Sequence, residues 1–588
     1  MEMINGNDLF QMFNYGNTFI SNKRKHLNDI NVFPVPDGDT GNNLTYTLNT
    51  ILRESKNYKS FIDSLDSISE AALIGARGNS GVIFAQFVNG LRFASNDYEE
   101  ITIKEFARLV RAAHTHTVSS LSNPVEGTMI TILDCWADSL ESESEKKQPL
   151  KEVFKLAYEY ARESLERTKA MLDVLVKNDV VDSGALGFVL FFKGVSSYFN
   201  NEKVELVDTE TVEIEDAHEF VTEIKFRYCT EGLLKYNDLD EEKLKSDLNA
   251  FGDSIIIAKG KTRLRVHIHT NNPEHVFSTL EEHGQIESQK IDDMLLEMNI
   301  KNAKDKRVVV TDSIADLSPE IILDNNVIVI PINIMLNGTS YLDKLSISNK
   351  LLFNNLGKFT EYPKTATPSI KFINDLFSKL FLKFDEIFVI TVSKKLSGTY
   401  EVIKREADKL NAKNKNIYVI DSKNNSVTEG LIVMKAIELI KSDKTKEEIV
   451  ETLESLTNKT NILVCLDTFK YATMSGRVPK AVGKFGMFIG LRPIMSLADG
   501  KGTAFGFAFR QKGITKKIVK LIKRDMEKNG INSYALVHCL NEKLVKEYNL
   551  LFTTIIGQEP KYITEISTAT AIHSGVGSVA IGYIKDNE

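Results

Sequence analysis

NVFPVPDGDTGNN, residues 31–43, places two carboxylates, Asp37 and Asp39, on either side of one glycine. Two prolines stiffen the approach to this loop, and a helical pattern begins after it, near Leu44. Mg²⁺ prefers oxygen ligands from one or two carboxylates, completed by phosphates and water. The loop therefore predicts a magnesium site ahead of a helix. The alternative is an ordinary turn, because Asp-Gly is common in hairpins.

A second loop, GARGNSG at 75–81, precedes the apolar helical pattern VIFAQFVNGL. Glycines allow close approach of the backbone, and a helix N-terminus offers free N–H groups to a phosphate. The loop lacks the Gly-Lys-Ser/Thr ending of a Walker loop. The alternative is a tight turn between two packed helices. Two further polar breaks, PVEGT at 124–128 and VDSG at 181–184, interrupt the same region, so four loops could converge at one end of a helical barrel.

Hydrophobic periodicity divides the chain into three regions. Apolar spacings of three and four predict helices through about residue 200. After an acidic stretch the period changes to two, and EFVTEIKFRYC, DSIIIAKG and RLRVHIHT are typical of strands. Beyond about residue 306, short apolar runs such as RVVVTDS and NILVCLDT alternate with amphipathic helical segments, which indicates an α/β sheet with largely parallel strands. We expect a multidomain protein: all-α at 1–205, small α+β at 215–300, and α/β at 306–588.

Length and composition limit the function classes. The 588 residues suit about three domains, and the net charge of −7 disfavours a dominant surface for nucleic acid or acidic lipid. The start of the chain, MEMINGNDLFQMFNYG, has no basic region followed by an apolar run, so we expect no signal peptide. No run of about 18 apolar residues predicts a transmembrane segment. Four cysteines without Cys-x-x-Cys spacing favour a reducing cytoplasm.

Two histidines in RLRVHIHT suggest a metal site. His267 and His269 share one face of the predicted strand, about 7 Å apart. With Cys229, at the end of a neighbouring predicted strand, they could hold Zn²⁺. The alternative is a polar sheet face beside an unpaired buried cysteine.

The four N-terminal motifs NVFPVPDGDTG, GARGNSGV, PVEGT and VVDSGALG resemble the nucleotide-binding domain of dihydroxyacetone kinases, in the branch of the fatty acid kinases. The resemblance covers roughly the first 200 residues. It implies an eight-helix barrel that holds ATP at one mouth, with two Mg²⁺ between the phosphates and the aspartate loop. Asp37 and Asp39 match the metal-binding carboxylates, and Asn31 lies nearest to a third aspartate of those kinases. The positions that match expected nucleotide contacts are Thr40, Gly41, Asn42, Asn79, Ser80, Gly81, Thr128, Asp182 and Gly184.

The segments FRYCTEG and VHIHTNNP are similar to the central domain of fatty acid kinases. This similarity implies a domain that forms a homodimer and a functionally important cluster of Cys229, His267 and His269.

From Arg307 onward the chain resembles the DegV family of fatty-acid-binding proteins, on motifs that include TDSIADL, KTATPS, SKKLSGTY, SGR and HSGVG. Taken singly, each motif also fits an ordinary strand-to-helix turn. A fatty acid carboxylate needs hydroxyl and N–H donors at the mouth of an apolar tunnel. The resemblance assigns carboxylate binding to Thr365, Ser397 and Gly398, and places Arg477 and His573 near the carboxyl group, where positive charge could stabilise a transferring phosphoryl group.

Together the resemblances imply a fatty acid kinase. It would phosphorylate a long-chain fatty acid held in its own C-terminal domain, giving acyl phosphate and ADP, with Asp37, Asp39, Arg477 and His573 as catalytic residues. An acyltransferase that uses acyl phosphate would be its downstream partner. Two alternatives remain open. One is a kinase for a small metabolite like dihydroxyacetone, and the other is a non-catalytic, lipid-binding regulatory protein.

Overall fold

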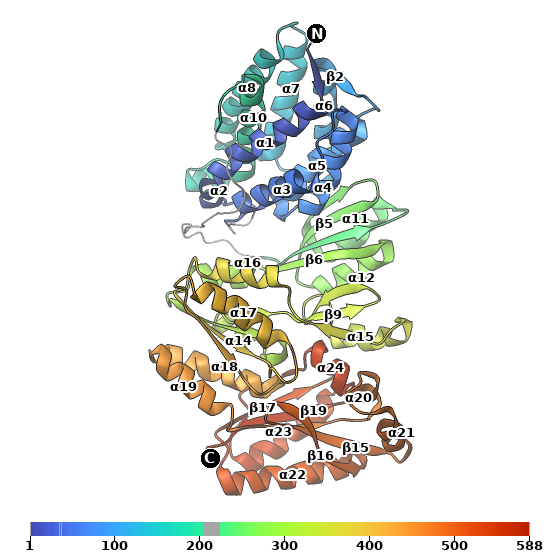
Figure 1. Ribbon diagram of the computed structural model, residues 1–588, viewed down its shortest axis with the longest axis vertical. Helices are drawn as coiled ribbons and strands as arrows, with labels where there is room; N and C mark the ends of the chain where they lie inside the picture. Colours follow the sequence, from blue (N-terminus) through green and yellow to red (C-terminus); the bar gives the residue numbers. More distant parts are fainter. Residues whose placement is uncertain (1, 35, 37, 205–223, 587–588) are drawn as a thin grey trace. The chain divides into compact units, whose positions relative to one another are not determined.

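The computed structural model describes residues 2–34, 36, 38–204 and 224–586 (Figure 1). It divides into two compact units, Met1–Met298 and Asn299–Glu588, which we describe separately. Asp37 and most of the acidic stretch after residue 204 lie outside the described residues. No helix of the described part combines the length and apolar character that a membrane crossing requires.

The N-terminal region of the first unit is helical, with a short antiparallel ribbon of β1 (Met3–Asn5) and β2 (Glu100–Thr102). Ten helices lie in its described part: α1 (Gly6–Asn22), α2 (Arg24–Asp29), α3 (Thr40–Glu54), α4 (Phe61–Gly75), α5 (Gly78–Ala94), α6 (Ile103–Ser120), α7 (Met129–Ser144), α8 (Leu150–Thr168), α9 (Asp173–Asn178) and α10 (Ser183–Phe199). Eight of them are 15–19 residues long, and α2 and α9 have six residues each. The resemblance implies eight helices, and the described part has ten.

Aromatic side chains form the core of this region and fix the helices that begin at the predicted loops. Phe84 of α5 and Phe188 of α10 are almost fully buried, with ring centroids 5.3 Å apart. Trp136 of α7 stacks on Phe192 at 3.9 Å. Each buried Phe contributes about 1.5–3 kcal/mol through burial of its ring. This packing holds α5, α7 and α10 against one another.

The rest of the first unit is a small β-rich domain with an antiparallel sheet in the order β4-β5-β3-β6. Its elements are β3 (Tyr228–Lys235), α11 (Glu241–Asn249), β4 (Gly252–Lys259), β5 (Arg263–Thr270), α12 (Pro273–His283), β6 (Gln285–Asp293) and α13 (Met294–Lys301). One face is apolar, and its Val266 and Ile268 share a buried cluster with Phe277 of α12. The opposite face, which carries His267 and Cys229, lies on the side of the sheet that meets α5 and α4.

The second unit contains three sheets. A parallel sheet has the order β13-β12-β7-β8, a three-stranded antiparallel sheet has the order β10-β9-β11, and a six-stranded sheet has the order β16-β15-β14-β19-β17-β18. The strands are β7 (Arg307–Asp312), β8 (Ile328–Ile330), β9 (Asn333–Leu336), β10 (Thr339–Leu342), β11 (Lys364–Ala366), β12 (Glu386–Thr391), β13 (Ile417–Asp421), β14 (Thr460–Cys465), β15 (Leu491–Ala498), β16 (Lys501–Phe509), β17 (Ser533–His538), β18 (Ile563–Glu565) and β19 (Val579–Ile584).

Helices separate and cover these strands (Figure 1). They are the 3₁₀ turns η1 (Ser313–Ala315) and η2 (Leu356–Lys358), and α14 (Pro319–Asp324), α15 (Asn349–Asn355), α16 (Ile370–Leu380), α17 (Thr399–Asn411), α18 (Ser426–Lys441), α19 (Lys446–Leu456), α20 (Lys470–Met474), α21 (Lys480–Phe488), α22 (Arg510–Asn529), α23 (Glu542–Ile556) and α24 (Thr568–Ser574).

The predicted largely parallel sheet is right for β7, β8, β12 and β13. It is wrong for the three-stranded sheet and for the six-stranded sheet, whose pairs are antiparallel except for β17 with β18. The run NILVC forms β14, which pairs antiparallel with both β15 and β19. Asp499 and Gly500 join β15 to β16 in a two-residue turn with φ of +48° and +74°. Positive φ at both turn positions is the geometry of a tight hairpin, which requires antiparallel strands.

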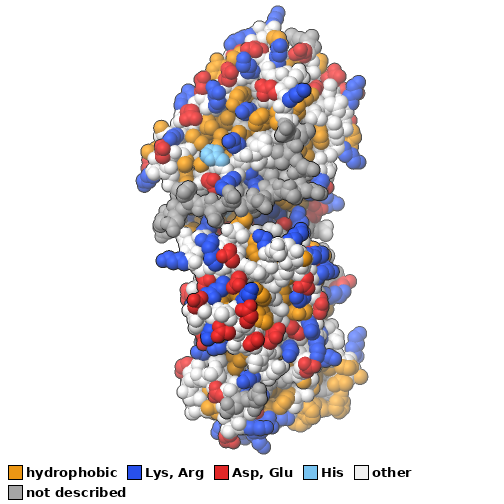
Figure 2. Space-filling model, turned by 60° about the vertical axis from the view of Figure 1, so that its left-hand side comes forward, with side chains coloured by type: hydrophobic (Ala, Val, Ile, Leu, Met, Phe, Trp, Pro, Cys, Tyr) orange, Lys and Arg blue, Asp and Glu red, His pale blue; other side chains and the backbone are white. Residues whose placement is uncertain are grey.

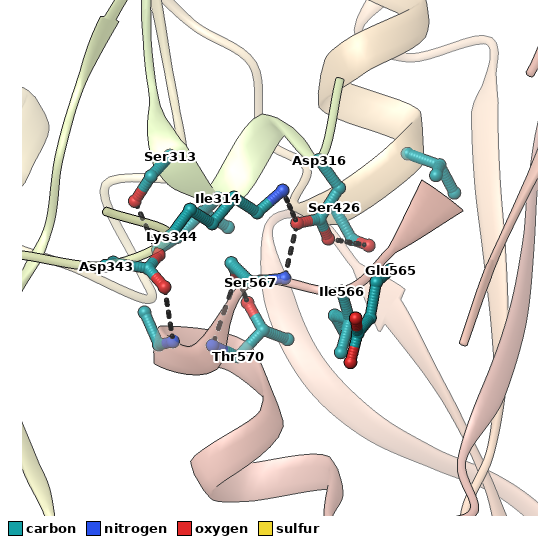
Figure 3. A network of polar contacts seen from close by, with 12 residues as sticks. Ser313, Ile314, Asp316, Asp343, Lys344, Ser426, Glu565, Ile566, Ser567 and Thr570 are labelled. Carbon is teal, nitrogen blue, oxygen red and sulfur yellow. Dashed lines mark hydrogen bonds and ion pairs between the residues drawn. The ribbon is translucent and has the colours of Figure 1, made fainter. Parts of the chain in front are cut away.

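A buried polar network joins α24 to the residue after η1, to the start of α18 and to the segment after β10 (Figure 3). Asp316 accepts hydrogen bonds from Ser567 N–H and the Ser426 hydroxyl, both at 2.6 Å, and pairs with Lys344 at 2.9 Å. Asp343 accepts the N–H of Thr568 at 2.8 Å. These bonds satisfy the first turn of α24, which carries His573.

Exposed apolar side chains gather on α21 and β16. They include Val482, Phe485, Phe488, Phe505, Phe507 and Phe509. Phe488 is 88% exposed, and apolar side chains collect at the C-terminal end of the space-filling view (Figure 2). The segment 470–530 holds 14 Lys and Arg against 3 Asp and Glu, although the whole chain is acidic. This exposed apolar surface therefore lies in a basic segment of an acidic chain.

The second unit should lose stability as the pH rises from about 6.5 to about 8. Burial raises the pKa of Asp312 to about 7 and that of Glu429 well above its usual value. The folded state therefore keeps protons that the unfolded chain releases, so its stability falls with pH. His573, whose pKa burial lowers to about 4, acts in the opposite direction only below 6.5.

Glu429→Gln should reduce this slope, because an amide keeps the shape and never ionises, while Asp312 still contributes about 1 kcal/mol over this range. We expect the wild-type loss to exceed that contribution, measured by calorimetry of the full chain. The single tryptophan, Trp136, lies in the first unit and reports its unfolding separately. An equal slope in wild type and Glu429→Gln would contradict the assignment.

Candidate functional site

The helix starts of the N-terminal region converge as the four loops predict. A Cβ on Gly78 would lie 2.1 Å from Asn43 Nδ2, which brings the glycine loop against α3. A Cβ on Gly184 would lie 2.3 Å from Met129 Cε and 3.7 Å from Ser80 Oγ. The starts of α3, α5, α7 and α10 thus meet at one place. Glycine is required at positions 78 and 184, because a Cβ would collide with these neighbours. At Gly78 the φ of +58° is a second reason, since other residues rarely adopt it.

The aspartate loop presents one described carboxylate. Asp39 precedes the first residue of α3, and its half-buried side chain makes no capping bond. Asn31 is buried, and Gly38 between the aspartates has φ of +67°. A carboxylate that is not engaged in capping can serve a cation. Asp37, the second predicted ligand, lies outside the described residues.

The neighbouring backbone is tightly packed. Thr40 and Gly41 are buried, and a Cβ on Gly41 would lie 2.2 Å from the carbonyl oxygen of Arg24. The N–H of Asn42 donates to Asn28 Oδ1 at 3.2 Å. This part of the loop is therefore fixed by α2.

The glycine loop differs from the expectation in one respect. The first-turn N–H groups that stay outside the hydrogen-bond ladder of α5 belong to Gly78, Asn79 and Ser80, because Gly81 N–H already donates to Arg77 O at 3.0 Å. The N–H of Gly78 donates to Glu231 Oε1 of the middle domain at 2.7 Å. The groups of Asn79 and Ser80 are those that suit an anion.

The other two loops are held by their own polar residues. Thr128 precedes α7 and donates its hydroxyl to Val125 O at 2.7 Å. Asp182 caps α10 by accepting the N–H of Ala185 at 2.7 Å, and burial raises its pKa to about 7. Ser183 donates its hydroxyl to Leu27 O at 2.6 Å. Asp182, predicted as a nucleotide contact, thus also has a structural role at the helix start.

Cys229, His267 and His269, which we call the Cys–His cluster, come together in the middle domain. Their ligand atoms lie within 4.8 Å of one another, and Cys229 Sγ is 3.8 Å from His267 Nδ1. Tetrahedral Zn²⁺ with ordinary bond lengths separates sulfur and nitrogen by about 3.6 Å. His267 Nε2 is buried and finds no hydrogen-bond partner among the described residues. Burial lowers the pKa of His269 to about 3, which keeps its ring neutral and able to bind a metal. The residues fit a metal ion.

Charged residues that the sequence analysis missed surround this cluster. Glu231 is fully buried and pairs with Arg265 at 2.5 Å and with Lys290 at 3.8 Å. Although burial opposes it, these cations hold the pKa of Glu231 well below its usual range. Burial and Glu231 raise the pKa of the Cys229 thiol, and the charge of Asp39 adds to the rise. The sequence could have indicated Glu231, because residues 229 and 231 are two apart on one strand and so share a face of the sheet.

In the second unit, the predicted carboxylate site has two adjacent parts. Thr365 is exposed on β11. Ser397 Oγ lies 2.9 Å from Thr399 Oγ1 at the start of α17. A Cβ on Gly398 would lie 3.4 Å from the Thr367 γ-methyl, so the two loops lie side by side. Hydroxyl and N–H donors are thereby grouped at one surface.

Arg477 and His573 are close enough to interact. Burial, with the charge of Arg477, lowers the pKa of His573 to about 4. His573 Nδ1 is buried without a hydrogen-bond partner in the described part of the chain. Tyr362, which the sequence analysis missed, donates its hydroxyl to Ile572 O at 2.5 Å. This bond ties the segment before Thr365 to the residue before His573.

Comparison with protein families matches all three regions. The chain matches the DAK2 domain over residues 34–197, the FakA-like middle domain of fatty acid kinases over 225–300, and the DegV family, described as uncharacterised, over 306–586. It thus carries a DAK2 domain, a FakA-like middle domain and a DegV domain in one chain. A DAK2 domain implies nucleotide binding.

Curated relatives share part of this arrangement. The uncharacterised protein MG369 of Mycoplasma genitalium is 32% identical over 347 residues, which are 54% of this chain and 62% of that protein. An uncharacterised protein of Staphylococcus epidermidis is 31% identical over 306 residues, covering 50% of this chain and 55% of that protein. The chain spans little more than half the length of these relatives.

Solved structures resemble the second unit. A DegV family protein of Thermus thermophilus, described by its fatty acid binding, is 22% identical and covers 48% of this chain and 99% of its own, with a TM-score of 0.45. DegV of Bacillus subtilis, described as a fatty acid binding protein, is 22% identical and covers 48% of this chain and 100% of its own, with a TM-score of 0.43.

The Cys–His cluster should bind about one Zn²⁺ per chain. Cys229→Ser should weaken Zn²⁺ binding more than about tenfold, because the thiolate is lost as a ligand. Cys135→Ser is the matched control, since Cys135 lies in the same unit on α7. Mass spectrometry of metal content after dialysis measures both. Equal zinc content in the two variants would remove Cys229 from the site.

Proposed function

We propose that this chain is a fatty acid kinase, which transfers the γ-phosphoryl group of ATP to a long-chain fatty acid held in its DegV unit. The products are acyl phosphate and ADP. The observation that carries the proposal is the meeting of four helix starts in the DAK2 domain, beside a carboxylate that makes no capping bond. We read the eight longer helices as a barrel with ATP at this mouth, and we propose a cytoplasmic homodimer.

The donor side would be held by backbone and oxygen ligands. The N–H groups of Asn79 and Ser80, with Gly81 behind them, would bind phosphate oxygens at the positive end of α5. Thr128 and Gly184 would contact the rest of the nucleotide at the starts of α7 and α10. Asp39, with Asp37 and Asn31, would hold two Mg²⁺. The ions supply charge neutralisation to the β- and γ-oxygens.

The acceptor side would bind the fatty acid by its carboxylate. The hydroxyls of Thr365 and Ser397 and the N–H of Gly398 would donate to the two carboxylate oxygens. His573 would act as a neutral hydrogen-bonding group, because its lowered pKa leaves it uncharged near neutral pH. Arg477 would supply the positive charge that stabilises the transferring phosphoryl group. Acyl phosphate is a reactive acyl donor, so an acyltransferase is the consumer that we propose.

ATP turnover should depend on fatty acid and on Asp39. We expect ADP release to rise with oleate, and Asp39→Asn to lower that turnover by about 100-fold or more, because a metal-binding charge is lost. Asp97→Asn, an exposed position of the same region, is the control and should keep full turnover. Turnover with dihydroxyacetone in place of oleate would favour a small-metabolite kinase. Bound oleate without turnover would favour a regulatory protein.

Fatty acid binding should depend on Ser397. Its hydroxyl would make a hydrogen bond to a charged carboxylate, worth about 1.5–3 kcal/mol. Ser397→Ala should therefore weaken oleate binding by about tenfold or more, whereas Ser442→Ala, an exposed position of the same unit, should leave it unchanged. Native mass spectrometry and displacement of a fluorescent fatty acid measure the two affinities. Unaltered oleate binding by Ser397→Ala would place the carboxylate elsewhere.

A further inference from the structure

Glu231 is a buried carboxylate of the middle sheet that contacts the helical region. It lies on β3 at 1% exposure, two residues after Cys229 and directly across from His267 on β5. Because side chains alternate along a strand, the carboxylate shares the sheet face that carries the Cys–His cluster. The same side chain therefore borders both the cluster and the glycine loop.

The contact with the glycine loop is a short hydrogen bond at a residue that cannot move freely. Gly78 donates its N–H to Glu231 Oε1 at 2.7 Å and is the first residue of α5. Its φ is +58°, and a Cβ there would lie 2.1 Å from Asn43 Nδ2. The peptide is thus confined by Asn43 on one side and Glu231 on the other. Asn79 and Ser80, which follow, offer the N–H groups that the proposed function assigns to phosphate.

The contact with the cluster runs through His267. Its Nδ1 lies 3.8 Å from Cys229 Sγ and also 3.8 Å from Glu231 Oε1. Arg265 donates to the other carboxylate oxygen at 2.5 Å, and Lys290 Nζ lies 3.8 Å from Oε1. The ring of His267 thus stands between the thiol and the carboxylate. Any change in the orientation of that ring alters the surroundings of the oxygen that Gly78 uses.

We propose that Glu231 is a positioning residue that couples the Cys–His cluster to the glycine loop, so that a divalent metal in the cluster strengthens nucleotide binding. The inference rests on the proposed function, because it requires a nucleotide at the start of α5. Bound metal supplies a fixed orientation for its histidine ligands. With the His267 ring held, Glu231 keeps its bonds to Arg265 and Gly78, and the N–H groups of Asn79 and Ser80 converge on one point.

Thermodynamic linkage gives this coupling a quantitative signature. If the metal raises nucleotide affinity by some factor, the nucleotide must raise metal affinity by the same factor. We expect about tenfold, within the range usual for coupled sites. The equality holds whichever residue carries the coupling, so a variant of Glu231 is needed to assign the coupling to that residue.

The test compares two states of the full-length protein. One is loaded with one equivalent of Zn²⁺, and the other is stripped with dipicolinate. Calorimetry with Mg-ADP should give about tenfold tighter binding to the loaded state. Competition with a chromogenic chelator should give about tenfold tighter Zn²⁺ binding when ADP is saturating.

A matched pair of variants assigns the coupling to Glu231. Glu231→Gln keeps an oxygen for Gly78 N–H but removes the charge that Arg265 and Lys290 hold. Zn²⁺ should still bind, and both coupling factors should fall to about one. Glu287→Gln is the control, since Glu287 lies on β6 of the same sheet and pairs with Arg263 at 2.7 Å. That variant should keep the wild-type factor.

The outcomes separate the inference from the function on which it rests. Equal ADP affinity in the loaded and stripped wild-type protein would overturn the coupling and leave the kinase proposal standing. ADP binding in neither state would overturn both. Full coupling in Glu231→Gln would remove Glu231 from the path. If that variant fails to fold, the wild-type comparison decides, because it needs no substitution.

Discussion

A charge buried away from water must be matched where it lies, and the two units meet this constraint differently. In the first unit Glu231 is surrounded by Arg265, Lys290 and a backbone N–H, so it stays ionised inside the sheet. In the second unit, burial keeps Asp312 and Glu429 protonated to much higher pH. The first arrangement gives a fixed charge that can hold a loop. The second gives acid groups whose ionisation weakens the fold as the pH rises.

Helix packing in the first unit positions the loops before α5 and α10, and Glu231 contacts the first of them. The rings of Phe84 and Phe188 hold α5 and α10 together about one and a half turns beyond their first residues. Glycine at 78 and 184 then lets the backbone of each start approach its neighbours without a Cβ in the way. The aromatic core and the glycines therefore act together. The core brings the helices together, and the glycines let the N–H groups at the helix starts face a common space.

The sequence indicated the loops, the cluster and the three regions, because each depends on local chemistry: Asp-Gly and Gly-rich breaks, and alternation along a strand. It did not indicate the partners that come from other elements. The strand pattern places Glu231 on the same face as Cys229. It does not indicate the hydrogen bond to Gly78, which is 153 positions away. Tyr362 acts through a backbone oxygen 210 positions away, which no spacing rule predicts. The antiparallel sheet was missed although Asp499-Gly500 is a hairpin signal, because the apolar runs on either side suggested parallel strands.

Under the proposed function, how well the acceptor site stabilises the transferring phosphoryl group depends on the exclusion of water from it. His573 is neutral near pH 7, so the positive charge there rests with Arg477, which is exposed. An exposed cation stabilises a neighbouring anion weakly, because water screens it. Its effect on a transferring phosphoryl group grows once the solvent is excluded. Transfer to a bound fatty acid would then be favoured over hydrolysis of ATP wherever the bound acid excludes water from this guanidinium. Joining both sites in one chain would raise the effective concentration of one site for the other.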